Sequence, residues 1–424
     1  MSFKFKFKML NNDYVLNVIC KVLNLLIGFV TSMFCARYLG VVNKGAYSYI
    51  SQVANTCVIV FNLGVYQSYS FNYKKHVKET LKKYSDICFL QFVVYSAIAL
   101  LIIAFSKDMK LVLAAALVPF NLLKSQYENI VLIERMRFRM LIHVVDKIIL
   151  TACYGVLYFT AESNVIYIVV VTVFIDVFTV LVYLFRLGYF PKIWQVDFKF
   201  FKEVLKFGWL PMISLLLVTV NYSVDIFFLE HMGTAVELGY YSFAANIINY
   251  VWMLPDAFKE VLFSKSAKKL DRKNISISIQ ISLLSIGCCF AGFAVLGKFL
   301  ISVVYGSEYV PSYEVVLILI IGAFPMSMFK LLGIVLVSQG KRVMHFTSLA
   351  ISAAVNIVAN IVAIPRWGMM GAACASVLSY SVCACVLIPY FCKLFGFSLK
   401  DLFVPSREFF DTVKKCFKRN TSKS

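Results

Sequence analysis

Six lysines of this sequence lie inside long apolar runs, where a charged side chain is costly and therefore points to a specific role. The six are Lys21, Lys124, Lys147, Lys259, Lys298 and Lys330. A lysine ammonium is a compact point charge that suits a phosphate group. Lys21, Lys330 and Lys124 lie well inside their runs, and we expect them, in that order, to bind an anion.

Several of these lysines also have a structural explanation. Lys124 can form an ion pair with Glu128, one helical turn away. Lys147 and Lys259 are each next to an acid near a helix end, and they can extend to the membrane surface. Lys21 is ranked first because its own helix offers no acid within one turn.

Polar residues form a stripe along the first apolar run. They recur every three or four residues, which places them on one face of a helix; the members are Asn17, Lys21, Asn24, Gly28 and Thr31. Lipid offers such groups no hydrogen-bond partner, so this face is expected to meet protein or water.

Amide side chains recur in the second and eighth apolar runs. The second run carries Gln52, Asn55 and Asn62, and each position is matched 194 residues later by Asn246, Asn249 and Asp256. One interpretation is hydrogen bonding between helices, the usual role of Asn in membranes. The coincidence of three positions favours the other interpretation, in which these groups bind sugar hydroxyls in a cavity.

Two acids inside apolar runs are candidates for coupling transport to a cation. Asp225 lies in the seventh run and Asp256 in the eighth. Intramembrane carboxylates commonly mark ion pathways. The alternative, that they hold the two halves of the chain together, is equally favoured.

The elements that position these side chains are membrane helices. Of 424 residues, 61% are hydrophobic and 15% charged, and the mean hydropathy is +0.80; soluble domains are about 45–50% apolar and about 25% charged. A membrane helix needs roughly 20 apolar residues. Twelve such runs are predicted, at residues 15–34, 47–71, 87–105, 111–133, 141–159, 166–185, 207–229, 238–263, 275–305, 312–338, 344–365 and 371–391.

The distribution of Lys and Arg predicts the orientation. Nearly all loop cations lie in alternate loops and in the two termini, whereas the opposite loops carry Arg37, Lys44, Lys107, Lys110 and Arg366. By the positive-inside rule both termini are cytoplasmic. The net charge of +20 therefore reflects topology and does not indicate nucleic acid as a partner. The basic, amphipathic segment 406–420 is expected to lie on anionic membrane lipids.

Two internal matches indicate a repeat. YLGVVNKGAYSY (38–49) aligns with HMGTAVELGYYSF (231–243), which pairs Gly40 with Gly233 and Gly45 with Gly239, and residues 129–140 align with residues 333–344 at an offset of 204. These glycines are predicted structural hinges at the outer surface. The matched helices are six spans apart, so the halves are parallel, as in transporters that rock two bundles about a central site.

The predicted domains follow from this repeat. They are an N-terminal six-helix lobe (1–190), a cytoplasmic linker (191–206), a C-terminal six-helix lobe (207–392) and a basic amphipathic cytoplasmic tail (393–424).

Three stretches carry a family resemblance: the turn ARYLGVVNKGAYSYI (36–50), the N-x-x-x-D-x-x-x-L run (221–229) and IPRWGMMGAACASVLS (364–379). In order and spacing they resemble the Wzx-type polysaccharide flippases of the multidrug/oligosaccharidyl-lipid/polysaccharide exporter superfamily. The resemblance implies an all-α MATE-like fold of twelve transmembrane helices in two lobes around a central cavity.

The resemblance also implies a function. Such a protein translocates an undecaprenyl-pyrophosphate-linked oligosaccharide, a repeat unit of O-antigen, capsule or exopolysaccharide, to the outer leaflet of the bacterial inner membrane. It needs no cofactor, and its partners include a polysaccharide polymerase and a chain-length regulator.

Three other functions are alternatives. A multidrug antiporter of the same superfamily exports organic cations and would need acids where the first helix has Lys21. A peptidoglycan-precursor flippase typically has fourteen helices. A non-transporting membrane scaffold would leave the polar stripes without a purpose. An enzyme or a metal site is not expected, because the four histidines (His76, His143, His231 and His345) are isolated in the sequence and the twelve cysteines are scattered.

Overall fold

A computed structural model of the protein describes residues 13–73, 77–266 and 270–404. In these ranges nearly every residue is helical and no strand occurs, which confirms the all-α prediction. The N-terminal lysines Lys4, Lys6 and Lys8 and the amphipathic segment 406–420 lie outside the described residues.

Eight helical segments in the described ranges are long and apolar enough to cross a membrane. Helix α2 (Asp13–Phe61) and helix α13 (Arg342–Phe395) each continue through two of the predicted spans. Two other predicted spans fall short in length or hydropathy. They are helix α5 (Met109–Glu134), which contains the polar stretch 124–129, and the broken pair α9 (Ala235–Val251) and α10 (Met253–Ser266). The protein is therefore a multi-pass membrane protein, and the number twelve stays a prediction.

The chain divides into two compact units, Met1–Thr219 (unit 1) and Val220–Ser424 (unit 2). The boundary falls within helix α8 (Phe198–Met232). The finer limits of linker and tail stay predictions.

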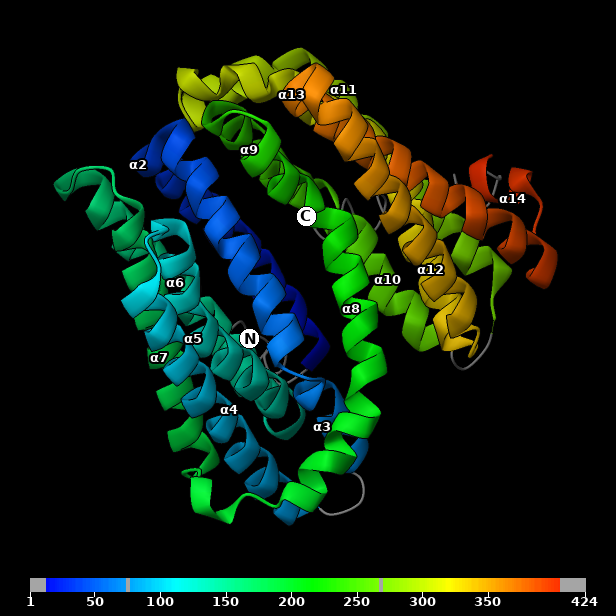
Figure 1. Ribbon diagram of the computed structural model, residues 1–424. Coiled ribbons are helices and arrows are strands. Elements are labelled where there is room, and N and C mark those ends of the chain that lie inside the picture. The colour runs from blue at the N-terminus through cyan, green and yellow to red at the C-terminus, as the bar shows by residue number, and fades with distance from the viewer. Residues whose placement is uncertain (1–12, 74–76, 267–269, 405–424) are drawn as a thin grey trace, which may run out of the picture. The chain divides into compact units, whose positions relative to one another are not determined.

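Unit 1 is a bundle in which α5 is central. Its other helices are α2, α3 (Val65–Tyr73), α4 (Val77–Phe105), α6 (Met136–Thr160), α7 (Val165–Leu187), the short 3-10 helix η1 (Ile193–Gln195) and the start of α8. Helix α5 packs on α2, α4 and α7, and α2 also packs on α6 (Figure 1). The core includes four fully buried tyrosines, Tyr69, Tyr84, Tyr127 and Tyr183.

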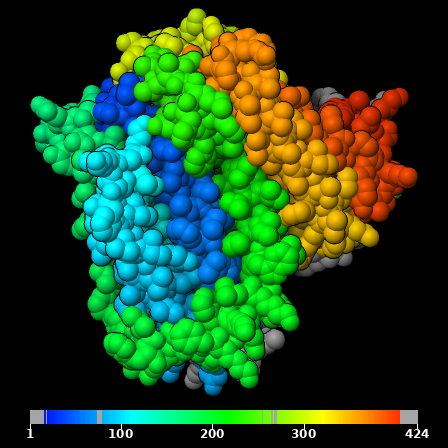
Figure 2. All heavy atoms as spheres, in the orientation of Figure 1, coloured from blue at the N-terminus to red at the C-terminus, as the bar shows by residue number. Residues whose placement is uncertain are grey.

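Unit 2 is built around α12 (Tyr313–Ser338), whose most apolar stretch is two-thirds buried. Helices α9, α10, α11 (Arg272–Val304) and α13 all pack against it. The gold surface of α12 adjoins the orange surface of α13 in Figure 2. The 3-10 helix η2 (Ser307–Ser312) leads into α12, and α14 (Leu399–Phe403) follows α13.

Polar caps mark where helices begin. The carboxylate of Asp108 accepts from the N–H of Lys110 at the start of α5, and the amide oxygen of Asn164 accepts from Ile166 at the start of α7. Thr234 and Glu237 form a reciprocal capping box on α9. These caps satisfy N–H groups that have no partner within the helix.

Two glycines bend the longest helices. Gly40 in α2 has φ 66° and Gly368 in α13 has φ 52°, both in the left-handed region that favours glycine. Gly233 lies in the bend between α8 and α9, whereas Gly45 and Gly239 lie inside helices and are buried. Of the four predicted hinge glycines, Gly40 alone has a left-handed backbone.

In each unit the turn after the first helix, at Gly40 in unit 1 and at Gly233 in unit 2, is hydrogen-bonded to a second turn. In unit 1 the Tyr38 hydroxyl donates to the Glu162 carbonyl at 2.7 Å, and the Ser163 hydroxyl donates to the Leu39 carbonyl at 3.0 Å. In unit 2 the N–H of Met369 donates to the Glu237 carboxylate at 3.4 Å. The turn after the first helix therefore contacts the turn between the fifth and sixth predicted spans in both units, as expected for a repeat.

Candidate substrate and coupling sites

Lys330 lies in α12 next to an acid and two aromatic rings. Its ammonium is 3.1 Å from Asp256 Oδ2, 4.2 Å from the ring centroid of Trp252 and 5.6 Å from that of Tyr222. The lysine side chain is 8% exposed and the aspartate side chain 45% exposed. The contact thus joins two predicted site residues, one assigned to the substrate and one to a coupling ion.

The same position in unit 1 has a neutral contact. The offset of 194 pairs Asn62 with Asp256, and the offset of 204 pairs Gln126 with Lys330. Gln126 Nε2 donates to Asn62 Oδ1 at 3.2 Å, and both residues are 0% exposed. The two units therefore repeat one contact, as an amide pair in unit 1 and as an ion pair in unit 2.

Asn62 belongs to a larger amide network. Its Nδ2 donates to Gln67 at 2.7 Å, and Gln126 also donates to Gln91 at 2.6 Å. Gln91 in turn donates to the carbonyl of Phe61 at 3.1 Å. These bonds connect the end of α2 with α3, α4 and α5, so the Asn62 amide already makes hydrogen bonds between helices.

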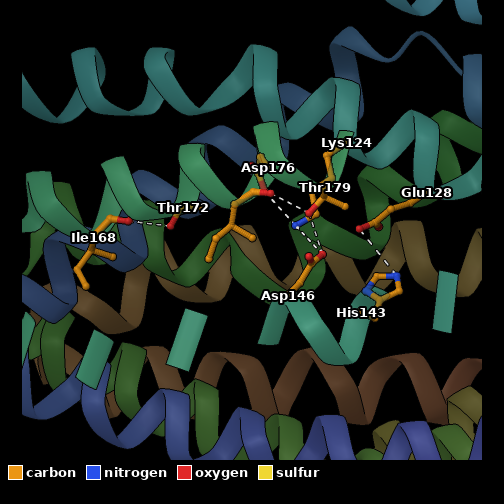
Figure 3. A network of polar contacts seen from close by, with 9 residues as sticks. Lys124, Glu128, His143, Asp146, Ile168, Thr172, Asp176 and Thr179 are labelled. Atoms are coloured by element: carbon orange, nitrogen blue, oxygen red, sulfur yellow. Dashed lines mark hydrogen bonds and ion pairs between the residues drawn. The ribbon is translucent and has the colours of Figure 1, made fainter. Parts of the chain in front are cut away.

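Lys124 lies in a buried cluster of charges in unit 1 (Figure 3). Its ammonium is 3.0 Å from Asp176 Oδ1 and 3.9 Å from Asp146 Oδ2. The Thr179 hydroxyl donates to Asp146 at 2.9 Å. The lysine thus meets acids from α6 and α7, neither of which is the Glu128 partner that the sequence suggests.

Glu128 lies beside the same cluster but contacts a histidine. Its Oε1 is 3.8 Å from His143 Nε2. Figure 3 shows Glu128 and His143 on one side of Lys124 and Asp176 on the other. Three helices, α5, α6 and α7, therefore bring ionisable groups together within the membrane-spanning bundle.

Asp225 is 0% exposed and is held by neutral donors. Tyr241 and Ser376 donate to its Oδ2 at 2.6 Å each, and Asn360 donates to its Oδ1 at 2.5 Å. The donors that surround this carboxylate are thus two hydroxyl groups and one amide.

The Asp225 site continues one turn along α8. Asn221 donates to Ser352 at 2.9 Å and accepts from Ser379 at 2.6 Å, and Asn356 donates to the Asn221 carbonyl at 2.9 Å. Asn356 and Asn360 are hydrogen-bonded to each other. The result is a continuous polar network between α8, α9 and both halves of α13.

The first two positions of the amide stripes have the same burial in both units. Gln52 and Asn246 are half-buried, and Asn55 and Asn249 are exposed. On the first helix Lys21 is exposed, and Asn24 has a buried Oδ1 with no hydrogen-bond partner. Neighbouring Thr31 is bonded to Thr151 on α6 at 2.6 Å, so the stripe turns from exposed to interhelical along α2.

The sequence interpretation missed several network members. Asp176, Asn356, Asn360, Ser376 and Ser379 were not selected. One signal was present, since Ser352, Asn356 and Asn360 recur every four residues and so share one helix face. Ser376 and Ser379 lie in the IPRWGMMGAACASVLS stretch, which indicates the family resemblance.

Polar contacts outside the spans fix the start of α8 in unit 1. The N–H of Phe200 and the ammonium of Lys83, 2.9 Å away, hold the pKa of Asp197 below its usual value. Burial, together with a hydrogen bond to Asp86, raises the pKa of Tyr189 to about 12. An open groove beside them is lined by Lys199, Lys202, Glu203, Leu205 and Lys206.

Metal ligands are not clustered in the described ranges: no group of three or more His, Cys, Asp or Glu side chains there could hold a metal ion.

The sequence matches one protein family. The family described as "Polysaccharide biosynthesis protein" matches residues 11–263. No curated protein matches the sequence significantly.

Solved structures share the fold. The lipid II flippase MurJ in an inward closed conformation has a TM-score of 0.75 at 15% identity, over 92% of this chain and 89% of that one. An inward-facing multidrug resistance MATE family transporter has a TM-score of 0.66 at 12% identity, over 88% and 94%. A transporter from Pyrococcus furiosus, described as having a binding pocket of reverse polarity, has a TM-score of 0.57 at 11% identity, over 92% and 97%. These TM-scores show that the chain shares a MATE-like fold with them, despite the low identities.

Proposed function

The chain belongs to the polysaccharide biosynthesis protein family, and on this premise we propose that it is a flippase. Its substrate would be an undecaprenyl-pyrophosphate-linked oligosaccharide, moved from the cytoplasmic to the outer leaflet of a bacterial inner membrane by alternating access. The sugar and pyrophosphate would cross inside the protein while the polyprenyl tail stays in lipid.

The observation that carries this proposal is the Lys330 site. A lysine inside a membrane helix costs free energy unless an anion pairs with it. Lys330 has such a counter-ion in Asp256, which is half-exposed. A pyrophosphate head supplies the anion. Lys21, exposed on α2, is proposed as a second contact. Lys124 is less suited, because its ammonium already pairs with Asp176 and Asp146.

Sugar hydroxyls need amide donors and acceptors. The half-buried or exposed members of the amide stripes, Gln52, Asn55, Asn246 and Asn249, are proposed for this role together with Asn24. Asn62 is less suited because its amide is already bonded to Gln67 and Gln126.

Asp225 is proposed as the coupling residue. A fully buried carboxylate with three neutral donors can gain a proton or a small cation at the cost of rearranging hydrogen bonds, without breaking an ion pair. Asp256 is a weaker candidate, because Lys330 already neutralises it.

The test is lipid-linked glycan transfer in reconstituted vesicles. Lys330→Gln is expected to abolish transfer, and Lys330→Arg to retain part of it, with both proteins folded and inserted. Full transfer by Lys330→Gln would refute the role of Lys330. Asp225→Asn is expected to remove the dependence on an imposed pH or sodium gradient.

A multidrug antiporter is the second candidate, favoured by the buried acid Asp225 and the half-exposed acid Asp256. Organic-cation efflux from the same vesicles separates the two: efflux that Asp225→Asn abolishes, without glycan transfer, would establish the antiporter. A non-transporting scaffold would show neither activity.

Both termini are proposed to be cytoplasmic. The polymerase and the chain-length regulator that would use the flipped product are proposed partners at the outer leaflet. Single cysteines at Arg137 and Lys107 test the orientation by labelling: the first should react from the cytoplasm and the second from outside. The reverse pattern would contradict the charge argument.

A further inference from the structure

The ammonium of Lys330 is enclosed by three groups of unit 2. Trp252 and Tyr222 present their rings at 4.2 and 5.6 Å, and Asp256 presents a carboxylate oxygen at 3.1 Å. Aromatic faces attract a cation without neutralising it. Asp256 is therefore the partner that balances the charge.

Asp256 is also the group through which the surroundings of Lys330 are exposed to solvent. The Asp256 side chain is 45% exposed, whereas the Lys330 side chain is 8% exposed and Trp252 is buried. An anion that approaches Lys330 meets Asp256 first, and it can contact the ammonium by taking the place of the carboxylate.

A second donor at the same place has no acceptor. The indole Nε1 of Trp252 is buried and makes no hydrogen bond, although a buried N–H is normally satisfied. Its ring is the one that Lys330 covers most closely. The site thus has more donor capacity than the single carboxylate of Asp256 uses.

The fold itself does not require an ion pair here. At the matching contact of unit 1, Gln126 and Asn62 provide the interhelical bond with neutral groups. The charges of unit 2 are an addition to this shared contact, so they call for an explanation other than helix packing.

We propose that Lys330 and the indole N–H of Trp252 form a phosphate site, which the protein's own Asp256 occupies until a phosphate group displaces it. The inference rests on the proposed function for the source of that group, the pyrophosphate of the lipid-linked substrate. Two phosphates carry more charge and more acceptor oxygens than one carboxylate, so they can satisfy both donors. When the substrate leaves, Asp256 rebinds Lys330 and favours release.

The site can be observed directly through Trp252. The full chain with Trp194, Trp209 and Trp367 replaced by Phe retains one tryptophan, and it is placed in zwitterionic nanodiscs. Titration with inorganic pyrophosphate and, separately, with undecaprenyl pyrophosphate should change its emission saturably, and Lys330→Gln should remove the response. Absence of a response to either ligand would overturn the proposal.

Asp256→Asn is the decisive variant. A competitor that occupies the site about nine-tenths of the time weakens apparent affinity about tenfold, so its removal should tighten pyrophosphate binding by about that factor. Glu260→Gln, which removes an equal charge from an exposed position on the same helix, should leave binding unchanged. Unchanged or weaker binding in Asp256→Asn would show that Asp256 is not a competitor.

Two further arms keep the outcome clear. If Asp256→Asn does not fold, Asp256→Ser at this half-exposed position provides the same comparison. Trp252→Phe, measured by calorimetry, should weaken binding severalfold because it keeps the aromatic face and loses the N–H; unchanged binding would remove Trp252 from the site. Tighter binding in Asp256→Asn, with no glycan transfer by the wild type, would refute the flippase and leave the phosphate site standing.

Discussion

Unit 1 and unit 2 make the same contact between corresponding helices with different chemistry. Gln126 and Asn62 meet as two amides at 3.2 Å with no exposure, whereas Lys330 and Asp256 meet as an ion pair at 3.1 Å with one exposed member. An amide pair can be buried cheaply when it is satisfied. Burying a charged pair carries a desolvation cost, and this cost is smaller when one member stays exposed to solvent.

The charges of unit 1 follow the opposite arrangement. Lys124 lies between Asp146 and Asp176, both of which are buried, and the cluster is cross-linked by Thr179. The lysine of unit 2 is arranged to exchange its partner, and the lysine of unit 1 is arranged to keep its partners. The repeat therefore supplies a common frame, and each unit uses it for a different purpose.

The largest effect is expected where the charges are most enclosed. Lys124→Gln leaves Asp146 and Asp176 without their cation, and breaking a buried ion pair typically costs about 3–5 kcal/mol. The thermal midpoint of the purified protein should fall strongly, and adding Asp176→Asn should recover part of the loss. A stable Lys124→Gln protein that no longer transports would instead place Lys124 in the substrate site.

A smaller effect, on transport rather than stability, is expected when unit 2 is given the chemistry of unit 1. The double variant Lys330→Gln with Asp256→Asn reproduces the Gln126–Asn62 amide pair. Transfer of lipid-linked glycan should fall at least about 100-fold, equivalent to about 2.7 kcal/mol. Stability should change by less than about 1 kcal/mol, because replacing both members of an ion pair by neutral groups is often neutral. Retained transfer would erase the functional difference between the units.

The helix breaks next to the Gln126–Asn62 and Lys330–Asp256 contacts also differ. In unit 1 the chain passes through Leu63 (φ 51°) and Gly64 (φ 76°), and a Cβ on Gly64 would lie 2.2 Å from the backbone of Gly208 in α8. In unit 2 the break at Trp252 has φ −74°, which any residue adopts. Gly64→Ala should therefore cost about 1–2 kcal/mol from the left-handed backbone alone.

The control for that substitution is Gly28→Ala in helix α2, where an added Cβ meets nothing within 4 Å. The thermal midpoint should be unchanged or slightly raised in the control, because Ala favours the helix. Equal midpoints for Gly64→Ala and wild type would show that α8 moves away from Gly64 without cost.

The smallest effect is expected from the ion pair of Lys83 and Asp197, which is half-exposed at the start of α8. The pKa of Asp197 is lowered in the folded protein, so its contribution is present above the unfolded value of about 3.9 and is lost as pH falls through the folded pKa. Asp197→Asn should destabilise by at most about 1 kcal/mol at pH 7, and the difference from wild type should shrink as pH falls through the folded pKa. A difference that does not shrink on acidification would assign it to packing.

Two residues of the candidate site in unit 2 could be anticipated from the sequence. Lys330 and Asp256 were both selected, because a charge in an apolar run is conspicuous in sequence. Their contact was not, because it joins residues 74 positions apart through packing of α10 on α12. The same reason explains Lys124: the nearest acid in sequence, Glu128, was an obvious partner, while Asp176 comes from a helix 52 positions away.

Composition and periodicity by themselves determined that this chain is an all-α membrane protein with a repeated half, because lipid permits few backbone structures and a repeat leaves equal spacings. They also determined which side chains are unusual. The tertiary structure alone decided which of these are neighbours: Asp225 with Tyr241, Asn360 and Ser376, and Lys330 with Trp252. The free energy of a buried charge depends on what surrounds it in three dimensions, and helix packing, which brings together residues more than a hundred positions apart, sets those surroundings.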